Sequence, residues 1–182
     1  MKHIGKSYKL VKSLDNVYDY IQLENGSFDE FLTVKVAMIL GVCGALRASE
    51  ICALEFEDIE YQQELINVNI RSSKTDQSSS GHSFFISPNS NKNQCFCELI
   101  KRYIQCFPAE QQTGRFLRKL SKIGKGTNRP IGVNIISVYA KNLADTLSLS
   151  GNFTSHCFRR SSATIAADAG ADMMSIKRHG QF

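Results

Sequence analysis

The sequence of 182 residues has no long uninterrupted apolar run. Its longest apolar stretch, from Val34 to Leu46, is broken by Lys35 and by glycines and is too short to span a bilayer. The first nine residues carry three lysines and a histidine with no apolar core behind them, so we expect no secretory signal. A composition of 42% hydrophobic and 21% charged residues is ordinary for a soluble globular protein.

The sequence also lacks the compact cysteine spacing of a small secreted protein. Its six cysteines lie mostly among apolar neighbours, which favours free thiols in an intracellular protein. The pair Cys95 and Cys97 has no second Cys or His pair nearby, so we predict no metal site. The six are Cys43, Cys52, Cys95, Cys97, Cys106 and Cys157.

Acidic residues are scarce in one part of the chain. Residues 1–100 carry 9 basic and 13 acidic side chains, whereas residues 101–141 carry 9 basic side chains and only one acid, Glu110. A basic block of this kind fits a polyanionic partner, although a solvated basic face is an equally good interpretation of the charge alone. The candidate contacts with such a partner are six cations of this block and three nearer the end of the chain: Arg115, Arg118, Lys119, Lys122, Lys125, Arg129, Arg160, Lys177 and Arg178.

Periodicity predicts a mainly α protein with one small antiparallel β-sheet. Residues 1–26 form a polar lead-in, and residues 27–182 form one domain without internal repeats. A capping box at Ser27 and Glu30 opens the first long helix. Helices are predicted over 27–42, from about 49, and over 94–107, 134–149, 155–169 and 172–180, with strands over 65–70 and 82–86, a hairpin loop over 72–81 and a basic loop over 114–130.

Two basic clusters lie at turns between these elements. In Gly44-Ala45-Leu46-Arg47-Ala48-Ser49-Glu50-Ile51, an arginine lies between two helices and a carboxylate follows three residues later. In Ser155-His156-Cys157-Phe158-Arg159-Arg160, the histidine and the first arginine share one face of a helical first turn, where free backbone N–H groups favour an anion.

Together these motifs resemble the two arginine boxes of the tyrosine recombinases of phage-integrase type. Lys74-Thr75 lies between the boxes, in the hairpin where that family keeps a catalytic lysine. The resemblance covers about residues 28–182, and the sequence of residues 155–182 is most similar to recombinases of Crypton-class transposons. It implies the integrase catalytic-core fold, a double-stranded DNA partner, a possible homo-tetramer on DNA, a nuclear location, and no membrane, metal or other cofactor.

The resemblance also assigns roles to individual residues. Arg47 and Arg159 would hold the two non-bridging oxygens of the scissile phosphate and stabilise the charge that develops there. Lys74 would protonate the departing 5′ oxygen, and His156 would carry a proton beside the phosphate. Glu50 would orient Arg47. Taken singly, Arg47 and Glu50 are an ordinary helical ion pair, Lys74 a surface lysine and His156 a helix cap; the ordered set favours the functional interpretation.

The sequence departs from the family pattern at its end. Phe182 stands where the family has a second His or Trp, and it lacks an N–H donor. His179 lies three positions earlier and is predicted to be a helix-end residue. The nucleophilic tyrosine is expected about nine residues beyond Phe182, and we assign that role to none of the six tyrosines of the chain. We therefore expect this domain to lack its C-terminal tyrosine segment and these 182 residues to form no phosphotyrosine link.

Two other interpretations of the sequence stay open. One is a domesticated, non-catalytic module derived from a transposon recombinase, which would use the fold to bind DNA or protein. The other is a metal-dependent nuclease or transposase, which would need a cluster of carboxylates. The acidic residues Glu55, Glu57, Asp58 and Glu60 fit a solvated helix face better than such a cluster.

Overall fold

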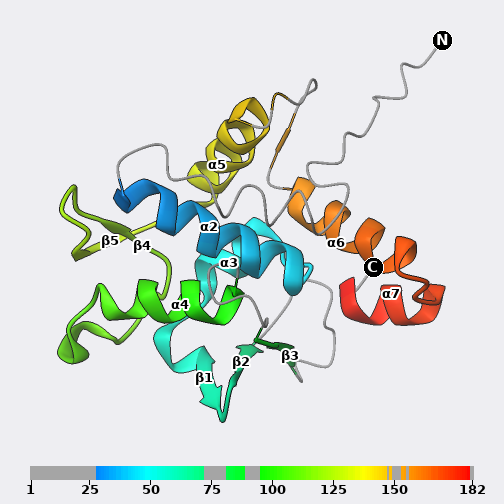
Figure 1. Ribbon diagram of the computed structural model, residues 1–182, viewed down its shortest axis with the longest axis horizontal. Coiled ribbons are helices and arrows are strands. Elements are labelled where there is room, and N and C mark those ends of the chain that lie inside the picture. The colour runs from blue at the N-terminus through cyan, green and yellow to red at the C-terminus, as the bar shows by residue number, and fades with distance from the viewer. Residues whose placement is uncertain are drawn as a thin grey trace.

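The fold is mainly helical, as the sequence predicts, and carries two small antiparallel sheets (Figure 1). The computed structural model describes residues 28–71, 81–88, 95–146, 148, 153–154 and 156–180. The predicted lead-in, the cap at Ser27 and most of the hairpin loop lie outside this range.

Helix α2 (Phe28–Cys43) runs through the middle of the molecule. Residues 36–40 are completely buried, so the helix is apolar on every side, as expected of a helix surrounded by other elements. It contacts α3 (Ala48–Ala53), α4 (Phe96–Gln105), α5 (Val133–Thr146) and α6 (His156–Asp168). Gly41 permits the closest approach, because a Cβ at that position would lie 2.8 Å from the Cβ of Phe158 on α6.

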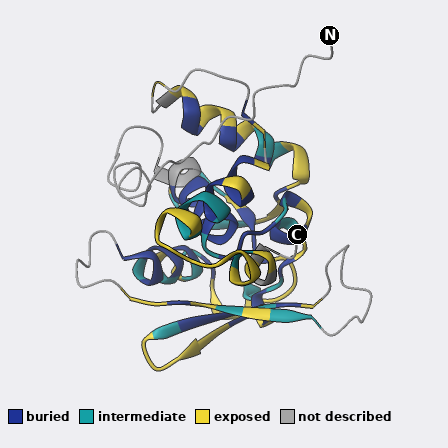
Figure 2. Ribbon diagram, turned by 90° about the vertical axis from the view of Figure 1, so that its right-hand side faces the viewer, coloured by how far each residue is buried: buried dark blue, intermediate teal, exposed yellow. Residues whose placement is uncertain are grey.

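The larger sheet has the order β1 (Ile59–Gln62), β2 (Leu65–Ile70) and β3 (His82–Ile86). β2 and β3 match the two predicted strands residue for residue, with Val68 opposite Phe84. The helices cover one face of the sheet, and most residues of the other face are exposed or partly exposed (Figure 2). On that outer face, Asn67 and Asn69 donate hydrogen bonds to Glu60 across the strands (3.3 and 3.0 Å).

Strand β1 was not predicted, and the predicted helix face for the acidic segment is wrong. The segment instead forms a 3₁₀ turn, η1 (Phe56–Asp58), and then β1. Phe56 packs edge to face on Phe107 and Phe116, which fixes the turn against the core. Asp58 is buried, so this carboxylate belongs to the interior rather than to a solvated surface.

The predicted basic loop contains a second sheet. After α4 and a short 3₁₀ turn, η3 (Ala109–Gln111), strands β4 (Arg118–Leu120) and β5 (Gly126–Pro130) pair antiparallel with an irregular register. Gly126 is required at the start of β5, next to the turn, because a Cβ there would lie 2.1 Å from the Phe107 ring. The Tyr103 hydroxyl also bonds to the ribbon, through the backbone of Arg118.

The last three helices agree closely with the sequence. α5 and α6 begin and end within a few residues of the predicted bounds, and α7 (Met173–Gly180) follows Gly170, whose φ of +85° ends the previous helix. Asp172 caps α7 by accepting hydrogen bonds from the backbone N–H groups of Met174 and Ser175 (2.9 and 3.0 Å).

Candidate active site

Arg47 is held at the start of α3 by a carboxylate from the same helix. Its backbone N–H donates to one oxygen of Glu50 and its guanidinium donates to the other, both at 2.7 Å. Glu50 is 7% exposed and the Arg47 side chain is 23% exposed. The carboxylate therefore fixes the side-chain direction of Arg47, while part of the guanidinium remains open to a ligand.

Arg159 reaches the same place from α6, more than a hundred residues later in the chain. Its guanidinium donates to the carbonyl oxygen of Ala45 (3.2 Å) and lies 4.0 Å from the carboxylate of Glu50. Ala45 has a left-handed φ of +49°, which is uncommon for a residue with a side chain. That conformation marks strain beside the two arginines, and the sequence did not predict it.

The two guanidiniums share one carboxylate, so the pocket keeps a net positive charge. Burial lowers the pKa of Arg159, the charge of Arg47 lowers it further, and Glu50 offsets part of the effect. An arginine stays protonated despite such shifts, so both side chains remain cations. An oxyanion placed between them would relieve their repulsion, which is the electrostatic requirement of a phosphate-binding site.

Two histidines lie on α6 and α7. His156 is exposed as the first residue of α6, one helical turn before Arg159. His179 lies near the end of α7, as predicted, and its Nε2 is 3.2 Å from the hydroxyl of Ser162 on α6. Partial burial of the ring, and then the charges of His82 and Arg159, lower the pKa of His179. The pocket charge thus reaches His179, which the sequence placed only at a helix end.

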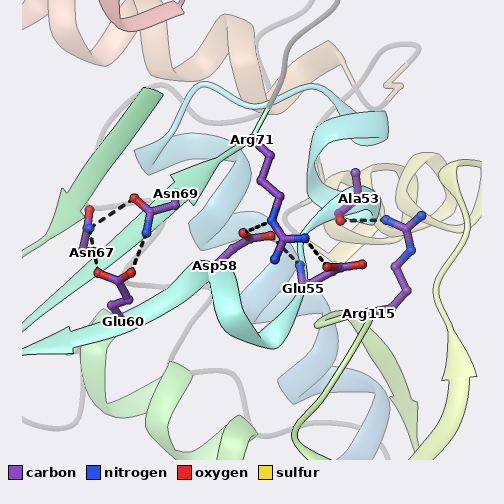
Figure 3. Close-up of polar contacts among 8 residues, drawn as sticks. All are labelled: Ala53, Glu55, Asp58, Glu60, Asn67, Asn69, Arg71 and Arg115. Atoms are coloured by element: carbon purple, nitrogen blue, oxygen red, sulfur yellow. Dashed lines mark hydrogen bonds and ion pairs between the residues drawn. The ribbon is translucent and has the colours of Figure 1, made fainter. Parts of the chain in front are cut away.

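An ion-pair cluster holds the end of β2 (Figure 3). The Nε of Arg71 donates to the buried carboxylate of Asp58 (2.6 Å), and its Nη1 pairs with Glu55. Asp58 also accepts the backbone N–H of Glu55 (2.8 Å). The cluster joins the strand end to the segment after α3. Lys74, three residues beyond Arg71, lies outside the described residues.

Two of the predicted DNA contacts, Arg118 and Arg115, bond to carbonyl oxygens of the protein itself. Arg118 is 6% exposed, lies with its guanidinium carbon 4.8 Å from the rings of both Phe56 and Phe107, and donates to the carbonyl oxygen of Gln111. This burial contradicts the predicted contact between Arg118 and DNA. Arg115 is exposed but donates to the carbonyl oxygens at the end of α3, at 2.7 Å for Ala53 (Figure 3).

Most of the other predicted DNA contacts are exposed. Six are exposed: Lys119, Lys122, Lys125, Arg129, Arg160 and Lys177. The side chain of Arg178, like Phe182, lies outside what the structure describes. The exposed cations remain the predicted DNA contacts.

The cysteines are free thiols. Burial raises the pKa of Cys97 to about 11, and Cys97 donates to the carbonyl oxygen of Ile86 (3.2 Å). The pKa of Cys43 is raised in the same way, to about 12. Both thiols are thus protonated near neutral pH. Within the described ranges, no group of three or more potential ligands could hold a metal ion, and no helix is both long and apolar enough to cross a membrane.

Of the described tyrosines, Tyr103 and Tyr139 are buried and Tyr61 is 45% exposed. The Tyr103 hydroxyl donates to the carbonyl oxygen of Arg118 (2.8 Å), and burial strongly raises its pKa. Burial also raises the pKa of Tyr61, to about 12. Tyr139 lies on α5 and is 8% exposed. A phenol with a raised pKa, as in Tyr61 and Tyr103, is a poor nucleophile because its phenolate form is disfavoured.

Comparisons with known proteins agree with this geometry. The model of the Phage integrase family matches residues 18–181. The chain is 25% identical over 175 residues to an integrase/recombinase xerD homolog of Selenomonas ruminantium, covering 96% of this chain and 50% of that protein. The chain thus spans about half the length of this curated relative.

Solved structures share the fold. The XerH site-specific recombinase bound to its palindromic difH substrate superposes with a TM-score of 0.67 at 12% identity, covering 92% of this chain and 44% of that one. The XerA recombinase gives a TM-score of 0.64 at 15% identity, with 98% and 57% covered. Lambda integrase(75-356), a dimer bound to a COC' core site, gives a TM-score of 0.57 at 14% identity, covering 98% of this chain and 58% of that one.

Proposed function

Because the chain belongs to the phage integrase family, we propose that this domain binds duplex DNA and takes part in the breakage and rejoining of DNA strands through a phosphotyrosine link. The observation that carries the proposal is the convergence of Arg47 and Arg159, from two distant helices, on the single carboxylate of Glu50. The ion pair between Arg47 and Glu50 can be explained as stabilisation of helix α3 alone. That explanation does not account for a second cation, the buried Arg159, beside the same carboxylate.

The chemistry follows from the charge of the reacting phosphate. When an oxygen attacks a phosphodiester, negative charge grows on the two non-bridging oxygens. Planar guanidiniums donate two parallel hydrogen bonds, so Arg47 and Arg159 are suited to hold these oxygens. Since the interaction strengthens as charge develops, it lowers the barrier to reaction as well as binding the substrate.

The remaining roles are part of the same proposal. His156 carries a proton beside the phosphate, Lys74 protonates the leaving 5′ oxygen, and Phe182 packs against the site. The role of nucleophile is assigned to none of the six tyrosines of the chain, and the raised pKa values of Tyr61 and Tyr103 disfavour their phenolate forms. The substrate in this proposal is double-stranded DNA, on which the protein acts as a tetramer. The protein derives from a Crypton-class transposon and is located in the nucleus; the similarity of residues 155–182 to recombinases of that class supports the origin.

A diester probe tests the phosphate grip directly. Dimethyl phosphate titrated into the isotopically labelled protein should shift the side-chain NMR signals of Arg47 and Arg159 together, with one binding constant. The matched control is Arg129, an exposed cation whose signal should not follow that curve. Shifts confined to exposed cations, or none at all, would overturn the assignment.

DNA substrates test the proposed reaction. Arg159→Lys keeps the charge but loses the planar fork, so it should weaken capture of nicked duplexes more than Arg129→Lys does. No SDS-resistant adduct should map to any of the six tyrosines of these 182 residues. An adduct on Tyr103 would refute that part of the proposal. Retention of DNA binding without the arginine dependence would favour the non-catalytic module.

A further inference from the structure

The tip of the β4–β5 ribbon presents an apolar side chain that the fold does not use. Ile123 is 78% exposed, more than any other large exposed hydrophobic residue among the described ones. It occupies a turn between the two strands, where small polar residues are usual. An isoleucine there adds nothing to the core and places a branched apolar group in water.

The turn that carries Ile123 is rigid. The backbone N–H of Gly124 donates to the carbonyl of Ser121 (2.9 Å), and the N–H of Ser121 donates to the carbonyl of Lys125 (2.7 Å). The Ser121 hydroxyl also accepts the N–H of Lys125 (3.1 Å). Gly124 has a φ of +75°, the left-handed residue that closes a three-residue hairpin. Lys122 and Ile123 are therefore held in place at the apex.

The root of the ribbon is equally fixed. The buried Arg118 guanidinium lies against Phe56 and Phe107 and bonds across the ribbon to Asn128 (3.3 Å). The hydroxyl of Thr127 donates to the carbonyl of Lys119 (2.7 Å). A projecting element anchored in this way loses little conformational entropy when it binds, because it is already ordered.

The ribbon carries charge of only one sign. Lys119, Lys122, Lys125 and Arg129 are exposed on it, and the chain has no acidic residue between Glu110 and Asp145. Beside the ribbon, Lys125 and Arg102 line a hollow of about 540 Å³. The combination of a cationic flank and an apolar tip matches duplex DNA, which offers phosphates along the groove edges and stacked bases within.

We propose that the ribbon tip enters the minor groove of duplex DNA, where Ile123 wedges against a base step while Lys122 and Lys125 contact the flanking phosphates. This inference rests on the proposed DNA-binding function and adds a second contact to it. The ribbon and the arginine pocket lie at opposite ends of α2 (Figure 1): Leu32 borders the hollow beside the ribbon, and Gly41 abuts Phe158 of α6. The wedge therefore acts away from the reacting phosphate.

Side-chain replacements distinguish the contribution of Ile123 to DNA binding from that of the neighbouring lysines. Ile123→Ser should weaken binding to a short labelled duplex about tenfold without changing the salt dependence, since no cation is lost. The double change Lys122→Gln, Lys125→Gln should instead reduce the slope of log K against log salt by about 2. Ile123→Leu keeps an apolar group and should stay within about twofold of the wild-type affinity.

Two further readouts report insertion itself. A duplex containing 2-aminopurine should brighten when the wild-type protein binds and not when Ile123→Ser binds, because only an inserted side chain unstacks bases. A minor-groove ligand should compete with the wild type, and a major-groove ligand should not. The matched control is Phe85→Ser, which removes a 54%-exposed apolar side chain from the outer sheet face, beside Asn67 and Glu60. It should leave affinity unchanged.

The outcomes distinguish the two proposals. Absence of duplex binding by the wild type at low salt would overturn the proposed function. Binding by the wild type with equal affinity for Ile123→Ser, or without 2-aminopurine brightening, would overturn the wedge and leave the proposed function standing. Thermal melting confirms that each variant is folded, which is expected of Ile123→Ser because the side chain is largely in solvent.

Discussion

Replacing Glu50 by glutamine should destabilise the free protein and strengthen its response to anions. The carboxylate contacts Arg47 at 2.7 Å and lies 4.0 Å from Arg159, so the change leaves two cations facing each other without a neutralising charge. Glutamine keeps the size of the side chain and an oxygen that accepts the Arg47 backbone N–H. The change is thus mainly one of charge.

The size of the effect follows from the geometry. Two unit charges 4 Å apart interact by about 4 kcal/mol at an effective dielectric of about 20, and removing one partner of a buried ion pair costs about 3–5 kcal/mol. Arg47 is partly solvated, and the amide oxygen retains a hydrogen bond. We therefore expect a loss of about 2–3 kcal/mol, which lowers Tm by roughly 5–10 °C in a domain of this size.

Anions should stabilise Glu50→Gln more than they stabilise the wild type. With the carboxylate gone, the pocket carries a second net positive charge, so sulfate should raise the Tm of Glu50→Gln by more than it raises the Tm of the wild type. Differential scanning calorimetry over a sulfate series measures both effects. Glu98→Gln is the matched control: it removes a half-exposed carboxylate paired with Lys101 (2.9 Å) and should change neither quantity appreciably. Unchanged stability, or an equal sulfate response in the two proteins, would refute the shared-carboxylate pocket.

Other variants test the core and its charges. Arg118→Met should cost about 2–4 kcal/mol in chemical denaturation, because the guanidinium's hydrogen bonds to the carbonyl oxygens of Gln111 and Thr113 are lost, yet the salt dependence of duplex binding should not change. Gly41→Ala should lower Tm, since the new methyl group collides with Phe158, and the guanidinium NMR signal of Arg159 should move with it. Duplex affinity should fall by orders of magnitude between about 50 and 200 mM salt, and a flat response would contradict an exposed cationic face. His179 has a lowered pKa, so the stability it contributes is present above the unfolded value of about 6.5 and lost as the pH falls; His179→Gln should flatten that part of a Tm-against-pH curve.

The elements that the sequence predicted well are those whose own residues determine them. The alternation from Leu65 to Ile70 determines a strand with one apolar face, and its observed bounds agree. α2 was predicted from its many apolar residues after the capping box at Ser27 and Glu30. The contact between Arg47 and Glu50 was predictable for the same reason, since residues three apart on a helix are neighbours.

The features that escaped prediction depend on distant residues. Arg118 resembles any cation of the basic block, and only the rings of Phe56 and Phe107 make its burial favourable. β1 is short and acidic and becomes a strand because β2 lies beside it. The left-handed backbone of Ala45 has no sequence signature, because glycine would be the expected residue there.

Helix α2 sets the geometry of any DNA that touches both ends of the molecule. From Leu32 to Gly41 the helix advances about 14 Å, which corresponds to about four nucleotide steps along one strand. Because the helix is rigid, the two contacts are also fixed in angle: a single residue inserted between them would turn one end by about 100° relative to the other. If DNA contacts both the arginine pocket and the ribbon tip as proposed, a helix rather than a flexible linker sets the distance between the two contacts, and insertion of one residue in α2 would change it.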